Sequence, residues 1–496
     1  MQDTAIPDSG DRGKADREHA RRGAATNVLT LAGQSSTLVF GTLAARLFGQ
    51  AAWGSYTTAT AWLDVLFRVA LVGNDKGLLV FVAARRRQAD EPGVVRALAT
   101  ALKVTVLSGF ACVLLMAGAS WLVARANGQP LDGLALRLMA PLALTSSLTT
   151  AALAATMATK NLQYNLYSRG LAEPAALLIL TALFGIFAPS MWTLAASALL
   201  AGLGALLVAI FGLSRRFDLA NLAKEFLHQP VERAIVRYTA PLALSELTNI
   251  VVFRLPIFVL VAYAAPAQRA VFNTCILLAA SISAIRGTFD AVFAPIAAES
   301  WVAQDRARLS ENLQRQSRTV LFFAIPFASL LIVGGPSWLA LFGPGFVVGA
   351  RALMVLALGN LFNAALGLTV WIHLASGRTR LMLINNVSVL VFELVLCAVL
   401  VPRFGVNGAA IAAALTMAAA QILYSIEVYI FARVHVLSAG FVALLVIGAV
   451  VVLGEAAIVR WFFPLARSAA ILVPIAGLPV YAASAWWFAR TKRQPQ

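Results

Sequence analysis

Long apolar stretches recur along almost the whole of this 496-residue chain, and they constrain its fold more than any other feature. A membrane-spanning helix needs about 20 consecutive apolar residues, and the stretches of that length are separated by short polar connections. We therefore expect an all-α polytopic membrane protein with about fourteen transmembrane helices. The predicted spans are 26–48, 53–82, 101–124, 138–158, 170–188, 191–213, 238–263, 270–296, 319–341, 352–375, 381–401, 407–432, 437–459 and 468–489.

The composition supports lipid as the solvent of this chain. Hydrophobic residues make up 60% of it, charged residues 12%, and the mean hydropathy is +0.81. A soluble domain carries about 25% charged residues, so this chain has too few to cover a water-facing surface. The net charge of +17 is spread over many short connections. We expect membrane lipids and not nucleic acid as the partners of these basic residues.

The distribution of lysine and arginine predicts the orientation, because cytoplasmic loops of membrane proteins are enriched in both. With the N-terminus in the cytoplasm, 26 of the 39 Lys and Arg residues lie in cytoplasmic segments and seven in outer loops. The clusters at 85–87 and 215–216 are the clearest members of the cytoplasmic set. We expect a multi-pass protein of the bacterial inner membrane with both termini in the cytoplasm.

An internal repeat predicts the domain organisation. Residues 47–56 resemble 262–272, and the short turns before Glu173 and Glu393 also correspond. Each unit spans six helices, and an even number returns the chain to its starting side, so the two lobes are expected to be parallel repeats. The predicted segments are a cytosolic tail (1–25), an N-lobe (26–213), a cytoplasmic interfacial linker (214–237), a C-lobe (238–433), and two further helices with a short basic cytosolic tail (434–496).

Enzymatic and metal sites are not expected. Cys112, Cys275 and Cys397 lie inside apolar runs, and no pair of them has the spacing of metal ligands. The four histidines are scattered. The outer loops are about a dozen residues or shorter, which leaves no outer domain to carry catalytic carboxylates. We expect no catalytic residue, metal or cofactor.

Two short motifs resemble a known family. Residues 26–34, 44–49 and 53–56 resemble the opening of Wzx-type polysaccharide-biosynthesis flippases, which belong to the multidrug/oligosaccharidyl-lipid/polysaccharide exporter superfamily. Residues 402–410 resemble the turn between two helices of that family's C-lobe. The resemblance implies export of an undecaprenyl-diphosphate-linked oligosaccharide, an O-antigen or exopolysaccharide unit, by alternating access. It also implies contact with the polysaccharide assembly machinery.

Charged residues inside the predicted spans are the candidate site, because a charge at the centre of a membrane helix costs about 2.5–3.5 kcal/mol. Residues four apart share a helix face, so Asp64 with Arg68 and Arg286 with Asp290 can each form a pair that neutralises itself. The alternative is that they line a central cavity. The candidates for that cavity are Arg254, Arg286, Arg68, Asp64, Asp290 and Glu246.

Arg254 differs from the other candidates because its helix offers no nearby acid. Glu246 is eight residues away, about 12 Å along a helix. Arg254 is therefore expected to meet a partner from another helix, water, or substrate. Pro241 and Pro256 are predicted to break the same helix, and Glu173 and Glu393 are candidates for binding a coupling ion.

Two other functions fit these residues. In a multidrug exporter of the same fold, coupled to a cation, the intramembrane acids have the primary role and the arginines are their partners. A membrane enzyme such as an O-antigen polymerase is a third interpretation, and the short outer loops count against it. The leading prediction is a flippase in which Arg254 and Arg286 bind the diphosphate of the lipid carrier.

Overall fold

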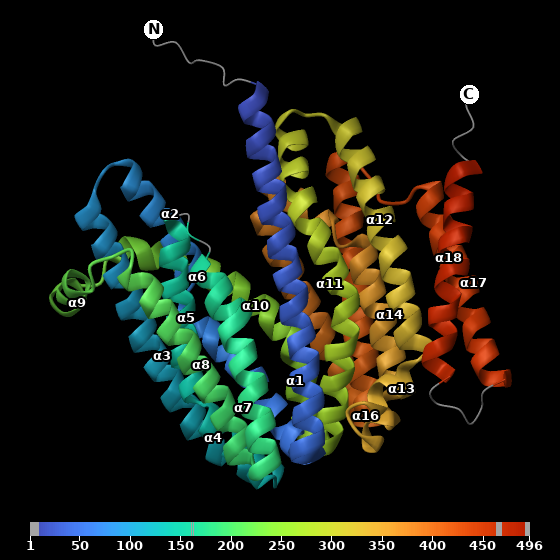
Figure 1. Ribbon diagram of the computed structural model, residues 1–496, viewed down its shortest axis with the longest axis horizontal. Helices are drawn as coiled ribbons and strands as arrows, with labels where there is room; N and C mark the ends of the chain where they lie inside the picture. Colours follow the sequence, from blue (N-terminus) through green and yellow to red (C-terminus); the bar gives the residue numbers. More distant parts are fainter. Residues whose placement is uncertain (1–8, 160, 162, 463–468, 492–496) are drawn as a thin grey trace.

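The computed structural model describes every residue except 1–8, 160, 162, 463–468 and 492–496. Of the residues that the structure describes, 91% are helical, and none lies in a strand. Figure 1 shows two bundles of roughly parallel helices, with a further helix pair beside the second bundle. We call the first bundle the N-lobe and the second the C-lobe.

The N-lobe contains the first half of the helices. They are α1 (Ser9–Leu71), α2 (Asn74–Arg87), α3 (Glu91–Asn127), α4 (Pro130–Met139), α5 (Pro141–Ala158), α6 (Gln163–Asn165), the π-helical turn η1 (Leu166–Ala172), α7 (Glu173–Phe187) and α8 (Met191–Ser214). The short helix α9 (Leu219–His228) follows and lies at one end of this lobe (Figure 1).

The C-lobe and the additional pair follow. The helices are α10 (Arg233–Tyr263), α11 (Pro266–Val302), α12 (Arg306–Val333), α13 (Gly335–Ala340), the 3₁₀ turn η2 (Pro344–Gly349), α14 (Ala350–Leu366), α15 (Thr369–Ala375), α16 (Thr379–Ala432), α17 (Ala439–Phe462) and α18 (Ala469–Thr491). The start of α1 and the end of α18 lie at the same end of the molecule (Figure 1).

Two glycines divide the longest helices. Gly49 in α1 has φ 84° and Gly405 in α16 has φ 53°, and each interrupts the helical backbone. A positive φ suits glycine because it has no Cβ. Each long helix is therefore two helices in sequence, and the divisions fall between predicted spans: 26–48 from 53–82, and 381–401 from 407–432.

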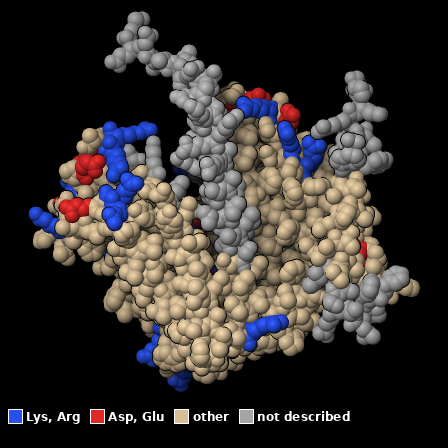
Figure 2. Space-filling model, in the orientation of Figure 1, with Lys and Arg blue, Asp and Glu red and all other residues tan. Residues whose placement is uncertain are grey.

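A wide apolar belt surrounds the bundle. Figure 2 shows Lys, Arg, Asp and Glu concentrated towards the two ends of the visible face, with a broad uncharged zone between them. Within the described residues, ten helices are long and apolar enough to cross a membrane. One of these, Arg380–Ala432, contains the Gly405 kink and covers two predicted spans. The protein is a multi-pass membrane protein, and the count of about fourteen crossings stays a prediction.

Three local expectations differ from the structure. The predicted span 53–82 is interrupted at Val72 and Gly73, which both have positive φ. Pro241 and Pro256 do not break α10, which runs from Arg233 to Tyr263 through both prolines; membrane helices tolerate proline where neighbouring groups satisfy the freed carbonyls. Helix α1 begins at Ser9, inside the segment 1–25 that was predicted as a tail, where Ala, Arg and Glu are good helix formers.

The two lobes approach each other closely at positions that lack a side chain. A Cβ on Gly54 would lie 1.8 Å from the carbonyl oxygen of Pro266, at the start of α11. A Cβ on Gly73 would lie 2.6 Å from the carbonyl oxygen of Thr239 in α10, and one on Gly77 would lie 2.3 Å from the methyl group of Thr239. Glycine at these positions allows the helices of opposite lobes to touch near both ends of the second half of α1.

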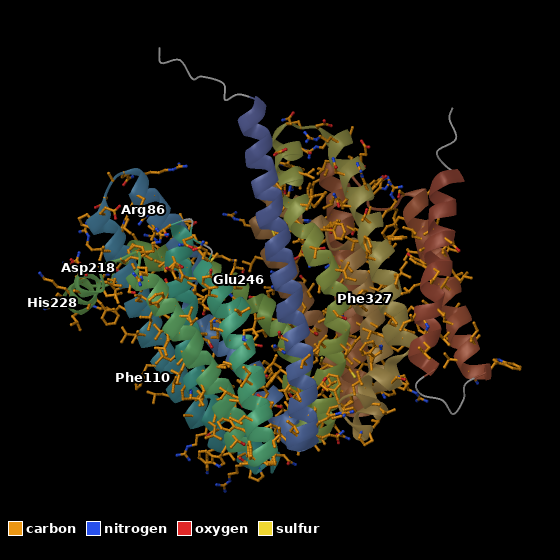
Figure 3. The ribbon with its side chains drawn as sticks, in the orientation of Figure 1. Arg86, Phe110, Asp218, His228, Glu246 and Phe327 are labelled. Atoms are coloured by element: carbon orange, nitrogen blue, oxygen red, sulfur yellow. The ribbon has the colours of Figure 1, made fainter. Side chains whose placement is uncertain are left out.

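Helix α9 lies beside the N-lobe as an amphipathic segment. Leu222 is buried in a core cluster with Phe217, whereas Leu227 is 72% exposed. In Figure 3, Asp218 and His228, near the two ends of α9, lie at the same end of the N-lobe as Arg86 of α2. This combination of apolar and basic side chains suits the boundary between lipid headgroups and acyl chains.

Candidate functional site

A cavity of about 490 Å³ lies between the two lobes. The N-lobe contributes α1 and α7 to its wall, and the C-lobe contributes α10 and α11. A volume of about 300–1,000 Å³ is typical of sites for small molecules. Among the described residues that line the cavity, the charged side chains are Arg254 and Glu173, and the uncharged polar ones include Thr57, Thr60 and Asn273.

Aromatic side chains form one part of the cavity wall. The rings of Trp53 and Tyr56 stack with centroids 5.5 Å apart and planes 13° apart. The ring of Phe40 meets both of them edge-on at 5.6 Å. The indole nitrogen of Trp53 donates a hydrogen bond to the hydroxyl of Thr274 in α11, at 3.2 Å. The wall is therefore held from both lobes.

Arg254 has a partner from another helix, which is one of the three possibilities that its isolation in sequence leaves open. Its guanidinium donates to the carboxylate of Asp64, which lies on α1 in the opposite lobe. The expected pair between Asp64 and Arg68 does not form, because Arg68 instead lies 3.6 Å from the carboxylate of Asp75. Tertiary packing brings an arginine of α10 to Asp64, and spacing along one helix carries no information about it.

A second ion pair joins the lobes along the same helix. Lys76 of α2 donates to the carboxylate of Glu246 on α10, and Figure 3 shows Glu246 in the region between the two bundles. Three acids and three cations therefore lie in this part of the molecule, four of them on α1 and α2 and two on α10. They are Asp64, Arg68, Asp75, Lys76, Glu246 and Arg254, and their formal charges sum to zero.

Arg286 and Asp290 form the pair that their spacing predicts, at 3.4 Å. The guanidinium of Arg286 also donates to the side-chain oxygen of Asn363 on α14, at 3.2 Å. Trp371 of α15 donates to Asp290, at 2.8 Å. Both charges are thus fixed by C-lobe neighbours, and neither is among the described residues that line the cavity.

The two acids proposed for ion coupling have different surroundings. Glu173 lines the cavity and accepts two hydrogen bonds from Arg169, at 2.9 and 3.1 Å. Glu393 on α16 is 2% exposed, and within the described structure one of its carboxylate oxygens has no hydrogen-bond partner. An unpaired buried carboxylate is costly. Among the described acids, Glu393 shares this feature with Glu225, which also has a buried carboxylate oxygen without a hydrogen-bond partner.

A fully buried ion pair lies at one end of the contact between the lobes, and the sequence interpretation missed it. Arg269 donates to Asp132 at 2.6 Å, and their side chains are 1% and 0% exposed. Arg269 also donates to the hydroxyl of Thr58, at 2.7 Å, and Ser55 donates to Asp132, at 2.7 Å. Both charges lie outside the predicted spans, Asp132 between 124 and 138 and Arg269 between 263 and 270, so they are not among the predicted intramembrane charges. The available signal is that each follows a proline that begins a helix, Pro130 and Pro266.

The described part of the chain contains no group of three His, Cys, Asp or Glu residues that could hold a metal ion. His373 is fully buried and bonds through Nε2 to the carboxylate of Glu427, at 2.8 Å. Asn385 donates to the same carboxylate oxygen, at 2.6 Å. These residues form a hydrogen-bonded link between α15 and α16.

Comparison with known proteins identifies the family and the fold. Residues 43–343 match a family described as "Polysaccharide biosynthesis protein". Comparison with curated proteins finds no match. Among solved structures, the lipid II flippase MurJ in an inward closed conformation matches with a TM-score of 0.73 at 14% identity, covering 94% of this chain and 99% of that one.

Two solved structures of MOP superfamily transporters are also similar. An inward-facing multidrug resistance MATE family transporter of the MOP superfamily matches with a TM-score of 0.66 at 15% identity, covering 82% of this chain and 97% of that one. A MOP superfamily transporter from Pyrococcus furiosus matches with a TM-score of 0.56 at 15% identity, covering 82% and 93%. The protein therefore has the two-lobed fold of this superfamily.

Proposed function

The chain belongs to the polysaccharide biosynthesis protein family, and from this premise we propose that it moves an undecaprenyl-diphosphate-linked oligosaccharide across the bacterial inner membrane. The observation that carries the proposal is the cavity between the lobes, which contains one arginine, several hydroxyl groups and an aromatic wall. A lipid-linked oligosaccharide presents a diphosphate, sugar hydroxyls and apolar sugar faces. The cavity offers a complementary group for each.

Arg254 is the residue that we assign to the diphosphate. A guanidinium stays charged inside the membrane and can donate two parallel hydrogen bonds to phosphate oxygens, which an ammonium cannot do. Arg254 lines the cavity and lies on α10, where the two lobes meet. Arg286, with its pair to Asp290, is proposed as a second cation that the substrate meets as the lobes move. Glu246 is assigned to the contact between the lobes through Lys76.

Alternating access then follows from the same residues. The two lobes contact each other through side chains and glycines and surround the cavity, so a change in their relative tilt would open it to one side of the membrane or the other. Glu393 and Glu173 are proposed as sites for a coupling ion. Glu393 is buried with an unpartnered oxygen, and Glu173 lies on the cavity wall.

We propose that both termini lie in the cytoplasm, as the excess of Lys and Arg in the inner loops predicts. Reporter domains fused after Arg87 and Leu222 should report the cytoplasm, because Arg85, Arg86 and Arg87 form part of the basic end of the N-lobe. Fusions after Gly128 and Pro189 should report the periplasm. A cytoplasmic signal at Pro189 would contradict this orientation and the arrangement of six helices in each lobe.

Deleting the gene is expected to abolish or alter a surface polysaccharide, because the repeat unit would be made and then left on the cytoplasmic leaflet. The measurement is the amount of lipid-linked oligosaccharide in membrane extracts, together with staining of the cell surface. Complementation with the wild-type gene is the control.

A multidrug exporter is the second candidate function, and the carboxylate of Glu173 in the cavity favours it because a carboxylate attracts cations. A deletion that changes sensitivity to cationic dyes and leaves the surface polysaccharide intact would support this candidate over the flippase. Loss of polymer length with normal transfer across the membrane would instead indicate a polymerase.

A further inference from the structure

We infer that Asp64 competes with the substrate for Arg254, so that the arginine is held by the protein's own carboxylate until an anionic group displaces it. This inference rests on the proposed function, because it concerns the residue assigned to the diphosphate. It adds a role for Asp64 that the proposed function does not contain.

The contacts of Arg254 carry the first step. Arg254 is the one cation among the described residues that line the cavity, and the hydrogen bond that the described structure gives its guanidinium is to Asp64. The side chains of Arg254 and Asp64 are 27% and 35% exposed, so neither is sealed inside the protein. A guanidinium has five N–H donors, and Asp64 accepts from a terminal nitrogen of Arg254, the kind of group that a phosphate would also bind. An incoming anion therefore meets Asp64 at the site that it must occupy.

Charge makes simultaneous binding unfavourable. A carboxylate and a phosphate on the same guanidinium repel each other, and like charges a few ångströms apart interact strongly where water is scarce. Asp64 must therefore move, and Arg68 lies four residues further along its own helix, on the same face. Among the described residues, the acid paired with Arg68 is Asp75, at 3.6 Å, and the Arg68 guanidinium also lies 5.3 Å from the centre of the Phe67 ring. The displaced carboxylate thus has a second cation within one helical turn.

The exchange also connects substrate binding to the movement of the lobes. Asp64 belongs to α1 in the N-lobe and Arg254 to α10 in the C-lobe, so their ion pair is a link between the lobes. When a phosphate binds Arg254 and Asp64 pairs with Arg68 instead, the ion pair between the lobes is lost. Each of these charged groups still has a group of opposite charge beside it. An anion in the cavity would therefore loosen one of the contacts that hold the lobes together.

The test is the affinity of the purified full-length protein for farnesyl diphosphate, measured by isothermal titration calorimetry in detergent. Asp64→Asn removes the competing charge and keeps the shape of the side chain. If the pair occupies Arg254 for about nine-tenths of the time, its loss should strengthen apparent binding about tenfold, because a site that is free for a fraction of the time binds correspondingly more weakly. Arg254→Gln should lose most of the binding, with or without Asp64→Asn.

Glu246→Gln is the matched control, because it breaks another ion pair between the same two lobes and leaves Arg254 untouched. It should change the affinity by less than about twofold, since the competition model predicts no effect from a carboxylate that does not occupy the arginine. If Glu246→Gln strengthens binding as much as Asp64→Asn, the effect is a general loosening of the lobes and the inference is wrong.

The remaining outcomes separate this inference from the proposed function. If Asp64→Asn binds no more tightly than wild type while Arg254→Gln loses binding, the anion site stands and the competition is refuted. If Arg254→Gln binds like wild type, the proposed anion site fails and the inference fails with it. Asp64→Ser serves as a second variant, with the same expected gain, if Asp64→Asn is not monodisperse in size-exclusion chromatography.

Discussion

Replacing Arg269 with alanine is expected to lower the free energy of unfolding by about 3–5 kcal/mol, because it would leave the carboxylate of Asp132 buried without a counter-charge. Both side chains are at most 1% exposed, and the guanidinium also bonds to Thr58. The measurement is denaturant unfolding of the purified protein in mixed micelles. Wild-type stability for this variant would show that water or another side chain can reach Asp132.

Two controls distinguish burial of charge from loss of a contact. The double change Asp132→Leu with Arg269→Met should recover most of the stability, since replacing both partners of a buried pair with apolar residues is often nearly neutral. Arg308→Ala removes an exposed pair, in which Arg308 lies 3.8 Å from Glu299. It should cost about 1 kcal/mol or less. The contrast between these variants tests the burial of the pair directly.

Replacing Arg254 with alanine is expected to abolish transport without preventing insertion into the membrane. The protein should reach wild-type abundance and fail to restore the surface polysaccharide of the deletion strain. Arg254→Lys should restore part of the surface polysaccharide, because the ammonium keeps the positive charge but cannot donate two parallel hydrogen bonds to a phosphate. The measurements are immunoblots of membrane fractions and the yield of surface polysaccharide.

The outcome for Arg254 also separates the two transport hypotheses. If Arg254→Ala transports normally at wild-type abundance, the arginine serves only its ion pair with Asp64. The site would then shift to the acids of the cavity, and Glu173 would become its principal charged group. That result would favour the multidrug exporter.

Apolar patterning predicts the helices of this protein well, because each span carries its own signal in about 20 consecutive residues. Gly49 and Gly405 divide long helices close to the predicted boundaries for the same reason. The break at Val72 and Gly73 falls where the predicted span passed over a polar stretch, residues 73–77, and it coincides with the close approach of α10 at Thr239. Pro241 and Pro256 show the opposite case, in which a strong local signal does not break the helix.

The candidate site could be predicted only where its geometry lies within one helix. Arg286 and Asp290 pair as their spacing indicates. Asp64 and Arg68 have the same spacing and do not pair, because Arg254 arrives from the other lobe. Asp132 and Arg269 are 137 residues apart, and only the docking of two lobes brings them together. Which charged residues pair between helices depends on how the helices pack. It cannot be predicted from the spacing of residues along either helix.

The six charges between the lobes have a consequence for the response of this protein to the membrane potential. The formal charges of these six residues sum to zero; they are Asp64, Arg68, Asp75, Lys76, Glu246 and Arg254. If their side chains move together during transport, no net charge therefore crosses the electric field. The field then acts on the cargo. Each elementary charge that crosses about 100 mV is worth about 2.3 kcal/mol, and a cytoplasm at negative potential repels phosphate outwards. With the proposed diphosphate cargo, the voltage would therefore drive the loaded step, and these six charges would add no voltage dependence to the empty return.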